Sequence, residues 1–416
     1  MTASAGVGRD DWEREATRRT GAGAVFDPYP RYAELRTLGP VLPGSIPSHF
    51  GLPDPVHHVF GDRPHFATFD WRTTERVLKD ADTFGNGGLA PMNVRQFGPV
   101  SLQSSDGVEH RRYRMLMQPA FARRGLAMWE RWLVGRLDSL IDEFEAAGHA
   151  DLYYAYCAPF PAYVTAMAFG VPAADVELFS RWAAMLQIGA STPEGADEAS
   201  RNVVDYMSGI IAERRREPQD DLISLLVNSE LPGEEGGGTA SDEQILGLVR
   251  NLMPAGVGTT FRTLGIVLIT LFERPELLAR VKVEPELVPR VIDEVLRWNP
   301  PLAWMLRMTT RDTVLEGVEI PAGAIVHAGI AAANRDPAVV SDPDEMNPDR
   351  PDLQHLSFSA GPHFCVGMQV SRLELETALS TLLRRLPGLV PDPDADRPEV
   401  TGLMFRMPTG APARWA

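Results

Sequence analysis

The 416-residue sequence is poor in cysteine, with only Cys157 and Cys365, and it lacks a long hydrophobic run. Two cysteines exclude a disulfide framework and a four-cysteine iron–sulfur cluster, and they suit a reducing cytoplasm. The strongest apolar run, residues 264–272, is far shorter than the roughly 20 residues of a membrane span. The N-terminus has no apolar core of the signal-peptide kind. We therefore expect a cytoplasmic protein that neither crosses a membrane nor carries disulfides.

Positive charge is also scarce, since the chain has 40 Lys and Arg against 56 Asp and Glu and a net charge of -16. This balance argues against a nucleic-acid partner. Local exceptions are the basic stretches 110–114 and 123–124. Cys157 lies in the aromatic segment 153–160, which predicts a buried, inert thiol.

The chain is long enough for a large core, and no linker divides it. We expect a flexible polar segment at 1–20 and a single domain over 21–416. Apolar periodicity predicts a mainly α protein with a minor β portion. The expected helices lie at 31–36, 73–79, 121–147, 175–188, 203–214 and 241–273, the expected strands at 66–69, 313–320, 325–329 and in the C-terminal tail, and the expected long or flexible loops at 84–103 and 233–238.

The most informative segment is Phe358-Ser-Ala-Gly-Pro-His-Phe-Cys365-Val-Gly367. Gly361 allows a turn, Gly367 leaves room for a flat ring system, and His363 can donate to an anion. A helix that starts just after Cys365 directs free amides at the sulphur, which lowers the pKa of a thiol. A haem thiolate favours O–O cleavage. A structural cysteine in a glycine-rich turn and a reactive thiol are the alternatives.

This segment closely resembles the haem-binding signature of the cytochrome P450 family, Phe-x-x-Gly-x-His-x-Cys-x-Gly. The resemblance implies one large helical domain with small β-sheets, with haem b between the central long helix and the cysteine loop. Cys365 is then the axial ligand of the iron, and the other haem contacts of this loop are Phe358, Gly361, His363 and Gly367. Ser359 departs from the pattern, because many bacterial members have glycine there.

The longest predicted helix begins with a capping-box spacing at Ser241 and Gln244. Its pattern is interrupted at 253–261, where Pro254 frees the carbonyl of Arg250 and glycines follow. A simple bend in a core helix is the alternative to a functional break.

The interruption resembles the family motif Ala/Gly-Gly-x-Asp/Glu-Thr-Thr/Ser, in which this helix crosses the haem. The resemblance implies that Ala255 and Gly256 contact the haem and that Thr259 and Thr260 are catalytic. Thr259 is expected to hydrogen-bond dioxygen in the site and to relay protons. Gly258 takes the slot of the acid and cannot relay a proton. Three explanations for the missing acid are open: water in the vacated space, a polar group of the substrate that completes the relay, or a peroxide-driven reaction. We favour the first two.

Two sets of charges fit the same resemblance. Glu294 and Arg297 share a helix face at i and i+3, which alone predicts only an ordinary surface pair. They resemble the family's Glu-x-x-Arg motif, which with Arg350 implies a buried structural network. The haem propionates require cationic donors, and the family positions fall on His110, Arg114, Arg307 and His363.

The resemblance implies a monooxygenase that inserts one oxygen atom from O2 into a small-to-medium apolar organic substrate. Electrons are expected from a ferredoxin and its NAD(P)H-dependent ferredoxin reductase, and the protein is expected to be a monomer. Arg111 and Arg112 are candidate docking charges, or merely solvated arginines. The alternatives are a peroxide-driven haem-thiolate oxidase or peroxygenase and a haem-binding sensor or carrier without turnover.

By the same resemblance four stretches line the substrate pocket, although each position also suits plain core. The candidates are Leu89, Met92, Val94, Phe97, Val257, Leu302, Ala303, Trp304, Met305 and Met404, with Leu403 and Phe405 beside them.

Overall fold

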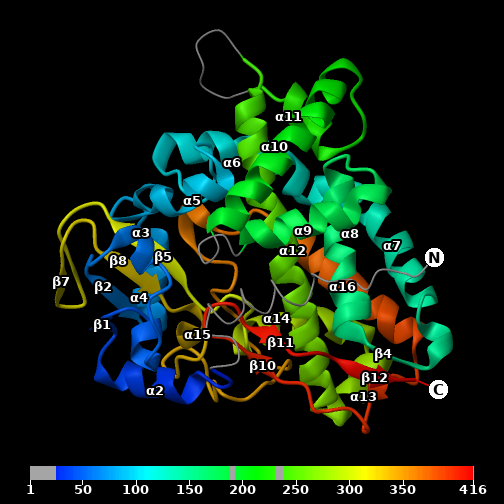
Figure 1. The fold of residues 1–416 in the computed structure, drawn as a ribbon. Helices are drawn as coiled ribbons and strands as arrows, with labels where there is room; N and C mark the ends of the chain where they lie inside the picture. Colours follow the sequence, from blue (N-terminus) through cyan, green and yellow to red (C-terminus); the bar gives the residue numbers. More distant parts are fainter. Residues whose placement is uncertain (1–24, 188–192, 231–237, 416) are drawn as a thin grey trace.

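A computed structural model describes residues 25–187, 193–230 and 238–415 of the chain. The segment predicted to be flexible at 1–20 lies outside the described residues, as does the loop predicted at 233–238 apart from Gly238. Figure 1 shows a β-sheet with α2 (Tyr29–Leu38), α3 (His57–Phe60) and α4 (Trp71–Lys79) on one side of the molecule. Helices make up most of the other side, and α12 (Asp242–Phe272) runs between the two parts.

The described residues are mostly helical. The other helices are α5 (Ala90–Phe97), α6 (Gly107–Phe121), α7 (Leu126–Asp142), α8 (Pro159–Ala168), α9 (Val176–Gln187), α10 (Pro193–Arg216), α11 (Leu222–Asn228), α13 (Pro275–Val283), α14 (Val288–Trp298), α15 (Ile330–Ala333) and α16 (Met368–Arg385).

Short strands form the minor β portion. The largest sheet has the order β1-β2-β8-β5-β3, in which β2 and β8 are parallel and the other neighbours antiparallel. The remaining sheets are β6-β7, β10-β11 and β4-β12-β9. The strands are β1 (Val41–Pro43), β2 (His65–Thr68), β3 (Phe84–Gly85), β4 (His149–Asp151), β5 (Met305–Thr309), β6 (Thr313–Leu315), β7 (Val318–Ile320), β8 (Ile325–Ala328), β9 (Val390–Pro391), β10 (Val400–Thr401), β11 (Met407–Pro408) and β12 (Pro412–Arg414).

The predicted mainly α class with minor β is confirmed, but three local predictions are wrong. Residues 84–103 are not a loop, because they contain α5, which has a proline in its first turn and ends at Gly98 with φ 77°. Residues 313–320 form a hairpin, since Glu316 and Gly317 both take positive φ as a tight two-residue turn requires. The helix expected over 121–147 is α7, which is shorter at both ends.

Helix α12 is the centre of the larger hydrophobic core, in contact with α8, α9, α10, α14 and α16. The predicted capping box is confirmed, because Ser241 and Gln244 exchange side-chain and backbone hydrogen bonds. The predicted interruption at 253–261 does not occur, and α12 stays helical through Pro254. By length and composition α12 suits a membrane span, yet 83% of its apolar window is buried inside the fold, as in a core helix.

A second core cluster lies under the large sheet, where Tyr32, Phe69, Trp304 and Ile325 pack together. Cys157 ends a π-helical turn and is fully buried, and burial raises its pKa well above the ordinary value. The predicted inert thiol is thereby confirmed.

Candidate active site

The loop that carries Cys365 is held by its backbone and by its approach to α4. The N–H of Cys365 donates to the Phe358 carbonyl over 2.8 Å, which closes the loop just before α16. Gly361 has φ 70°, and a β-carbon there would lie 2.7 Å from the Lys79 Cα atom. Position 361 therefore accepts only glycine. Ser359 takes φ 64°, a conformation that glycine adopts more easily, so the sequence departure carries backbone strain.

Cys365 lies two residues before the N-cap of α16, and its thiol is buried although the residue as a whole is partly exposed. Burial raises its pKa, whereas the N–H groups of Gly367 and Met368 and the charge of Arg114 lower it part of the way back. The predicted net lowering is therefore wrong for the free thiol. At Gly367 an added β-carbon would meet only the Cys365 sulphur, at 3.9 Å, so the space beside the sulphur is open to a flat ligand.

Donors without partners surround this space, as haem propionates require. His110 is 2% exposed and Arg307 is 3% exposed. The His110 Nε2 atom and the Nε and Nη2 atoms of Arg307 have no hydrogen-bond partner among the described residues. Burial lowers the pKa of His110 to about 4, helped by the charges of His363 and Arg114. Burial likewise lowers the pKa of Arg307 to about 10. Such buried donors need an anion, so this donor set fits haem.

His363 has a partner that the sequence did not suggest. Its Nε2 atom lies 3.0 Å from Asp106 Oδ1, and its ring lies 4.1 Å from the ring of His110. The other carboxylate oxygen of Asp106 accepts the N–H groups of Asn86 and Gly87 at 2.7 Å each. Asp106 thus ties the cysteine loop to the segment after β3.

Helix α12 is locally exposed at Ala255, within the segment that the family resemblance places at the haem. This residue is exposed and Thr259 is partly exposed, although Pro254, Val257 and Thr260 are buried. The Thr259 hydroxyl donates to the Ala255 carbonyl over 2.7 Å. Its oxygen lone pairs remain available to a ligand in the open space.

The slot left by the missing acid is filled by protein. A β-carbon on Gly258 would collide with the side-chain amide of Gln187, the last residue of α9. The amide donates to the Pro254 carbonyl over 3.1 Å and accepts from Arg262 Nη1 over 2.7 Å. Arg262 Nη1 also donates to the Gly258 carbonyl over 2.9 Å. The hypothesis that water fills this space is wrong, because an amide with no titratable proton occupies it.

Sequence reasoning also missed a buried acid behind α12. Glu374 on α16 is 3% exposed, and its Oε2 atom lies 3.4 Å from the Thr260 hydroxyl. Burial raises the pKa of Glu374 to about 8, so it holds a proton at neutral pH. The only sequence signal was an acidic residue between leucines in a helix, which also suits an ordinary surface position.

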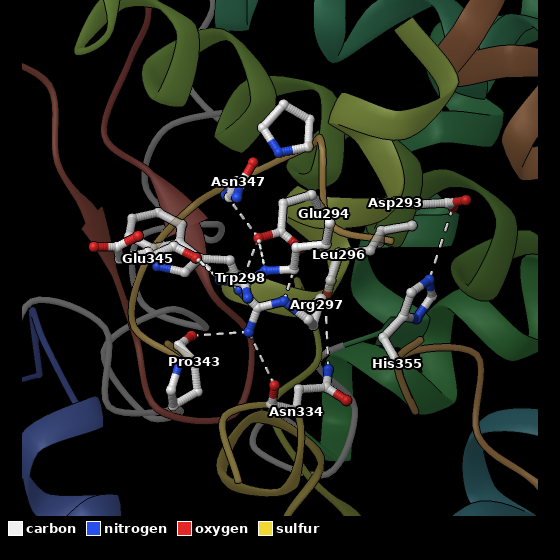
Figure 2. Close-up of polar contacts among 12 residues, drawn as sticks. Asp293, Glu294, Leu296, Arg297, Trp298, Asn334, Pro343, Glu345, Asn347 and His355 are labelled. Atoms are coloured by element: carbon white, nitrogen blue, oxygen red, sulfur yellow. Dashed lines mark hydrogen bonds and ion pairs between the residues drawn. The ribbon is translucent and has the colours of Figure 1, made fainter. Parts of the chain in front are cut away.

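The three predicted structural charges, Glu294, Arg297 and Arg350, come together in one network, and Figure 2 shows Glu294 and Arg297 with their partners. Arg297 donates two hydrogen bonds to the Glu294 carboxylate, from Nε to Oε2 over 2.7 Å and from Nη2 to Oε1 over 2.8 Å, and both side chains are fully buried. Arg350 Nε donates to Glu294 Oε1 over 2.9 Å, and the Asn347 N–H donates to the same oxygen. Both guanidinium groups also donate to backbone carbonyls. Arg297 donates through Nη1 to those of Asn334 and Pro343 and through Nη2 to that of Glu345, and Arg350 donates to those of Ser341, Asp342 and Glu345.

The pocket candidates do not all lie together. Those packed in or against the cluster under the sheet are Leu89, Met92, Ala303, Trp304, Leu403 and Met404. The Ala303 N–H donates to the Met404 carbonyl over 2.8 Å, and Leu302 bridges Phe405, so two distant stretches meet. Phe97 and Val257 belong to the larger core, Met305 packs on a third cluster, and Val94 is 44% exposed.

Comparison with known proteins agrees with this geometry. Residues 173–411 match the family described as Cytochrome P450. The chain is 35% identical to the mycinamicin IV hydroxylase/epoxidase of Micromonospora griseorubida over 76% of this chain and 79% of that protein. It is 34% identical to the nocardicin C N-oxygenase of Nocardia uniformis subsp. tsuyamanensis over 95% and 97%.

A solved structure shares the whole architecture. Cytochrome P450 CYP109Q5 from Chondromyces apiculatus superposes with a TM-score of 0.82 at 28% identity, covering 96% of this chain and 97% of that one. Family membership implies a haem thiolate and O2, and the cysteine loop and the unpartnered donors fit that group. The chain therefore belongs to the cytochrome P450 family and is a cytochrome P450 monooxygenase.

Proposed function

We propose that this monooxygenase inserts one oxygen atom into a small-to-medium apolar organic molecule with electrons from a ferredoxin and its NAD(P)H-dependent reductase. The observation that carries the substrate class is the apolar cluster in which Leu89, Met92, Ala303 and Met404 meet from three parts of the chain. Apolar lining with few polar groups is typical of small-molecule sites. The names of the relatives describe hydroxylation, epoxidation and N-oxygenation.

The haem, when bound at Cys365, supplies the activation of dioxygen. The chain supplies protons, and in this proposal Thr259 and Thr260 are the donors. Thr259 supports this role because its hydroxyl lies on the open stretch of α12. Thr260 supports it because its hydroxyl lies beside Glu374, a carboxyl that holds a proton at neutral pH. Gly258 contributes no proton and leaves room for the Gln187 amide.

For the electron donor we propose docking at the outer face of α6. Val108, Arg111 and Met115 are exposed at helical spacing, which combines a cation with two apolar contacts. An acidic ferredoxin is complementary to such a face. We also propose a cytoplasmic location, in keeping with two free cysteines.

Reconstitution tests the proposal and separates it from the peroxide-driven alternative. With ferredoxin, reductase, NADPH and a substrate chosen by a low-spin to high-spin shift, we expect NADPH oxidation that yields oxygenated product. Product from hydrogen peroxide alone, with no gain from the redox partners, would support the peroxygenase. No NADPH oxidation beyond that of the redox partners alone, across the substrate panel, would support a haem-binding protein without turnover.

A charge-reversal pair tests the docking face. Arg111→Glu is expected to slow ferredoxin-supported turnover and to leave peroxide-supported turnover unchanged. Arg181→Glu is the control, because Arg181 is exposed on α9, a different helix. Equal effects of the two substitutions would exclude α6 as the docking face.

A further inference from the structure

Three metal-ligand atoms converge at the large sheet, away from the cysteine loop. Asp54 Oδ2 lies 2.9 Å from His65 Nδ1, and His65 Nδ1 lies 3.0 Å from His327 Nε2. All three atoms lie within 4.8 Å of one another. Zinc bonds of about 2.0–2.1 Å in a tetrahedral arrangement place ligand atoms about 3.3 Å apart. The two short separations differ from that by a few tenths of an ångström.

The scaffold fixes each ligand. His65 is on β2 and His327 on β8, the parallel pair at the centre of the sheet. The second oxygen of Asp54 accepts the Val56 N–H over 2.9 Å, which turns Oδ2 toward His65. Ligands on strands hold their geometry better than ligands on loops, and a carboxylate with a fixed orientation binds through one oxygen.

Hydrogen bonds among Asp54, His65 and His327 cannot satisfy all three ligand atoms at once. His65 Nδ1 can carry one hydrogen at most, yet it faces two acceptors, Asp54 Oδ2 and His327 Nε2. If the hydrogen sits instead on His327 Nε2, the lone pair of His65 Nδ1 faces the Asp54 carboxylate, which is repulsive. A cation at the centre removes the conflict, because all three atoms then direct lone pairs at it.

The site is closed on the protein side and open on the other. The His327 side chain is fully buried, whereas those of His65 and Asp54 are 11% and 16% exposed. Water therefore reaches one side and can complete the coordination. Two imidazoles and one carboxylate suit a divalent transition ion better than Ca²⁺ or Mg²⁺, which prefer oxygen ligands.

We propose that Asp54, His65 and His327 form a zinc site that joins the segment before α3 to the central strands of the sheet. The ring of Trp304 lies 4.8 Å from that of His327 and belongs to the same cluster as the pocket candidates. The ion would thus stiffen the wall behind these residues without touching the haem.

The test uses the tag-free, haem-loaded protein, treated with EDTA, freed of chelator and equilibrated with Zn²⁺. Elemental analysis is expected to give one zinc for each haem iron, and zinc is expected to raise the unfolding midpoint. His327→Gln and the milder Asp54→Asn are each expected to weaken Zn²⁺ binding at least about 10-fold in calorimetric titration, since even outer-shell partners of a metal are worth about 10–100-fold. Haem content and spectrum should stay unchanged, which shows that the variants fold.

Exposed histidines provide the matched control. His57 and His58 lie on α3, close in sequence to Asp54, and both are exposed. The double variant His57→Ala, His58→Ala is expected to bind Zn²⁺ as the wild type does. Loss of zinc in this control would show adventitious surface binding and overturn the proposal. Equal zinc binding by wild type and both ligand variants would show that the cluster is only a hydrogen-bonded chain.

Discussion

Replacing Glu374 by glutamine should flatten the pH dependence of stability. Burial raises the pKa of Glu374 from the ordinary 4.5 to about 8, so the folded chain holds a proton that the unfolded chain releases. The stability linked to this proton is fully present below pH 4.5 and is lost as the pH rises through 8. A glutamine side chain has the same shape, stays neutral, and removes this contribution.

The magnitude follows from the two pKa values. A difference of about 3.5 pH units at about 1.36 kcal/mol each gives about 5 kcal/mol over the whole range. Between about pH 6 and pH 9 the wild type should lose about 2.6 kcal/mol more than the variant. A chain of 416 residues unfolds with an entropy of about 0.9 kcal/mol per degree, so this loss is about 3 °C in Tm.

Thermal unfolding of the haem-loaded proteins, followed by circular dichroism at about pH 6 and pH 9, measures this difference. Glu177→Gln is the control, because Glu177 is exposed on α9. Parallel pH dependence in wild type and Glu374→Gln would refute the reasoning, since it would mean that Glu374 ionises in the folded protein as it does in water.

Three further predictions test the site. The Gly258→Asp side chain must displace the Gln187 amide, and it supplies an acid in this position. We therefore expect the variant to change the fraction of electrons that end in hydrogen peroxide. An unchanged fraction in a peroxide assay would exclude this position from proton delivery. Ser359→Gly should stabilise the protein by about 1 kcal/mol by relieving the positive φ, and an unchanged unfolding midpoint would contradict the strain. Arg350→Ala leaves the buried Glu294 with one cation fewer, so we expect it to lower the free energy of unfolding by about 3–5 kcal/mol. The loss should appear as a lower unfolding midpoint and lost haem. A loss below about 1 kcal/mol would show that the network contributes little to the stable core.

The features predicted well from the sequence are those set by neighbours along the chain. The capping box at Ser241 depends on a residue three positions later. The strand predicted at 66–69 and the helix predicted at 31–36 lie at 65–68 and 29–38 in the structure, and both depend on residues close by in the sequence. Helix α5 was missed because its apolar residues follow no clear period, although Gly98 marks its end.

The features that sequence reasoning missed depend on side chains distant in sequence. Gln187 meets Gly258 only because α9 packs on α12, and nothing near Gln187 indicates that contact. Asp106 meets His363 across 257 positions. Glu374 resembles a surface acid until the packing of α16 shows that it is buried.

The link between Asp106 and His363 bears on how the protein is made. Two residues that contact the cysteine loop, Lys79 and Asp106, are synthesised more than 250 positions before the loop residues Gly361 and His363 that they meet. Contacts of such high sequence separation form late and slowly, because a long chain must close on itself first. The haem pocket therefore completes only after nearly the whole chain has been synthesised, because the cysteine loop follows Asp106 by more than half of the sequence.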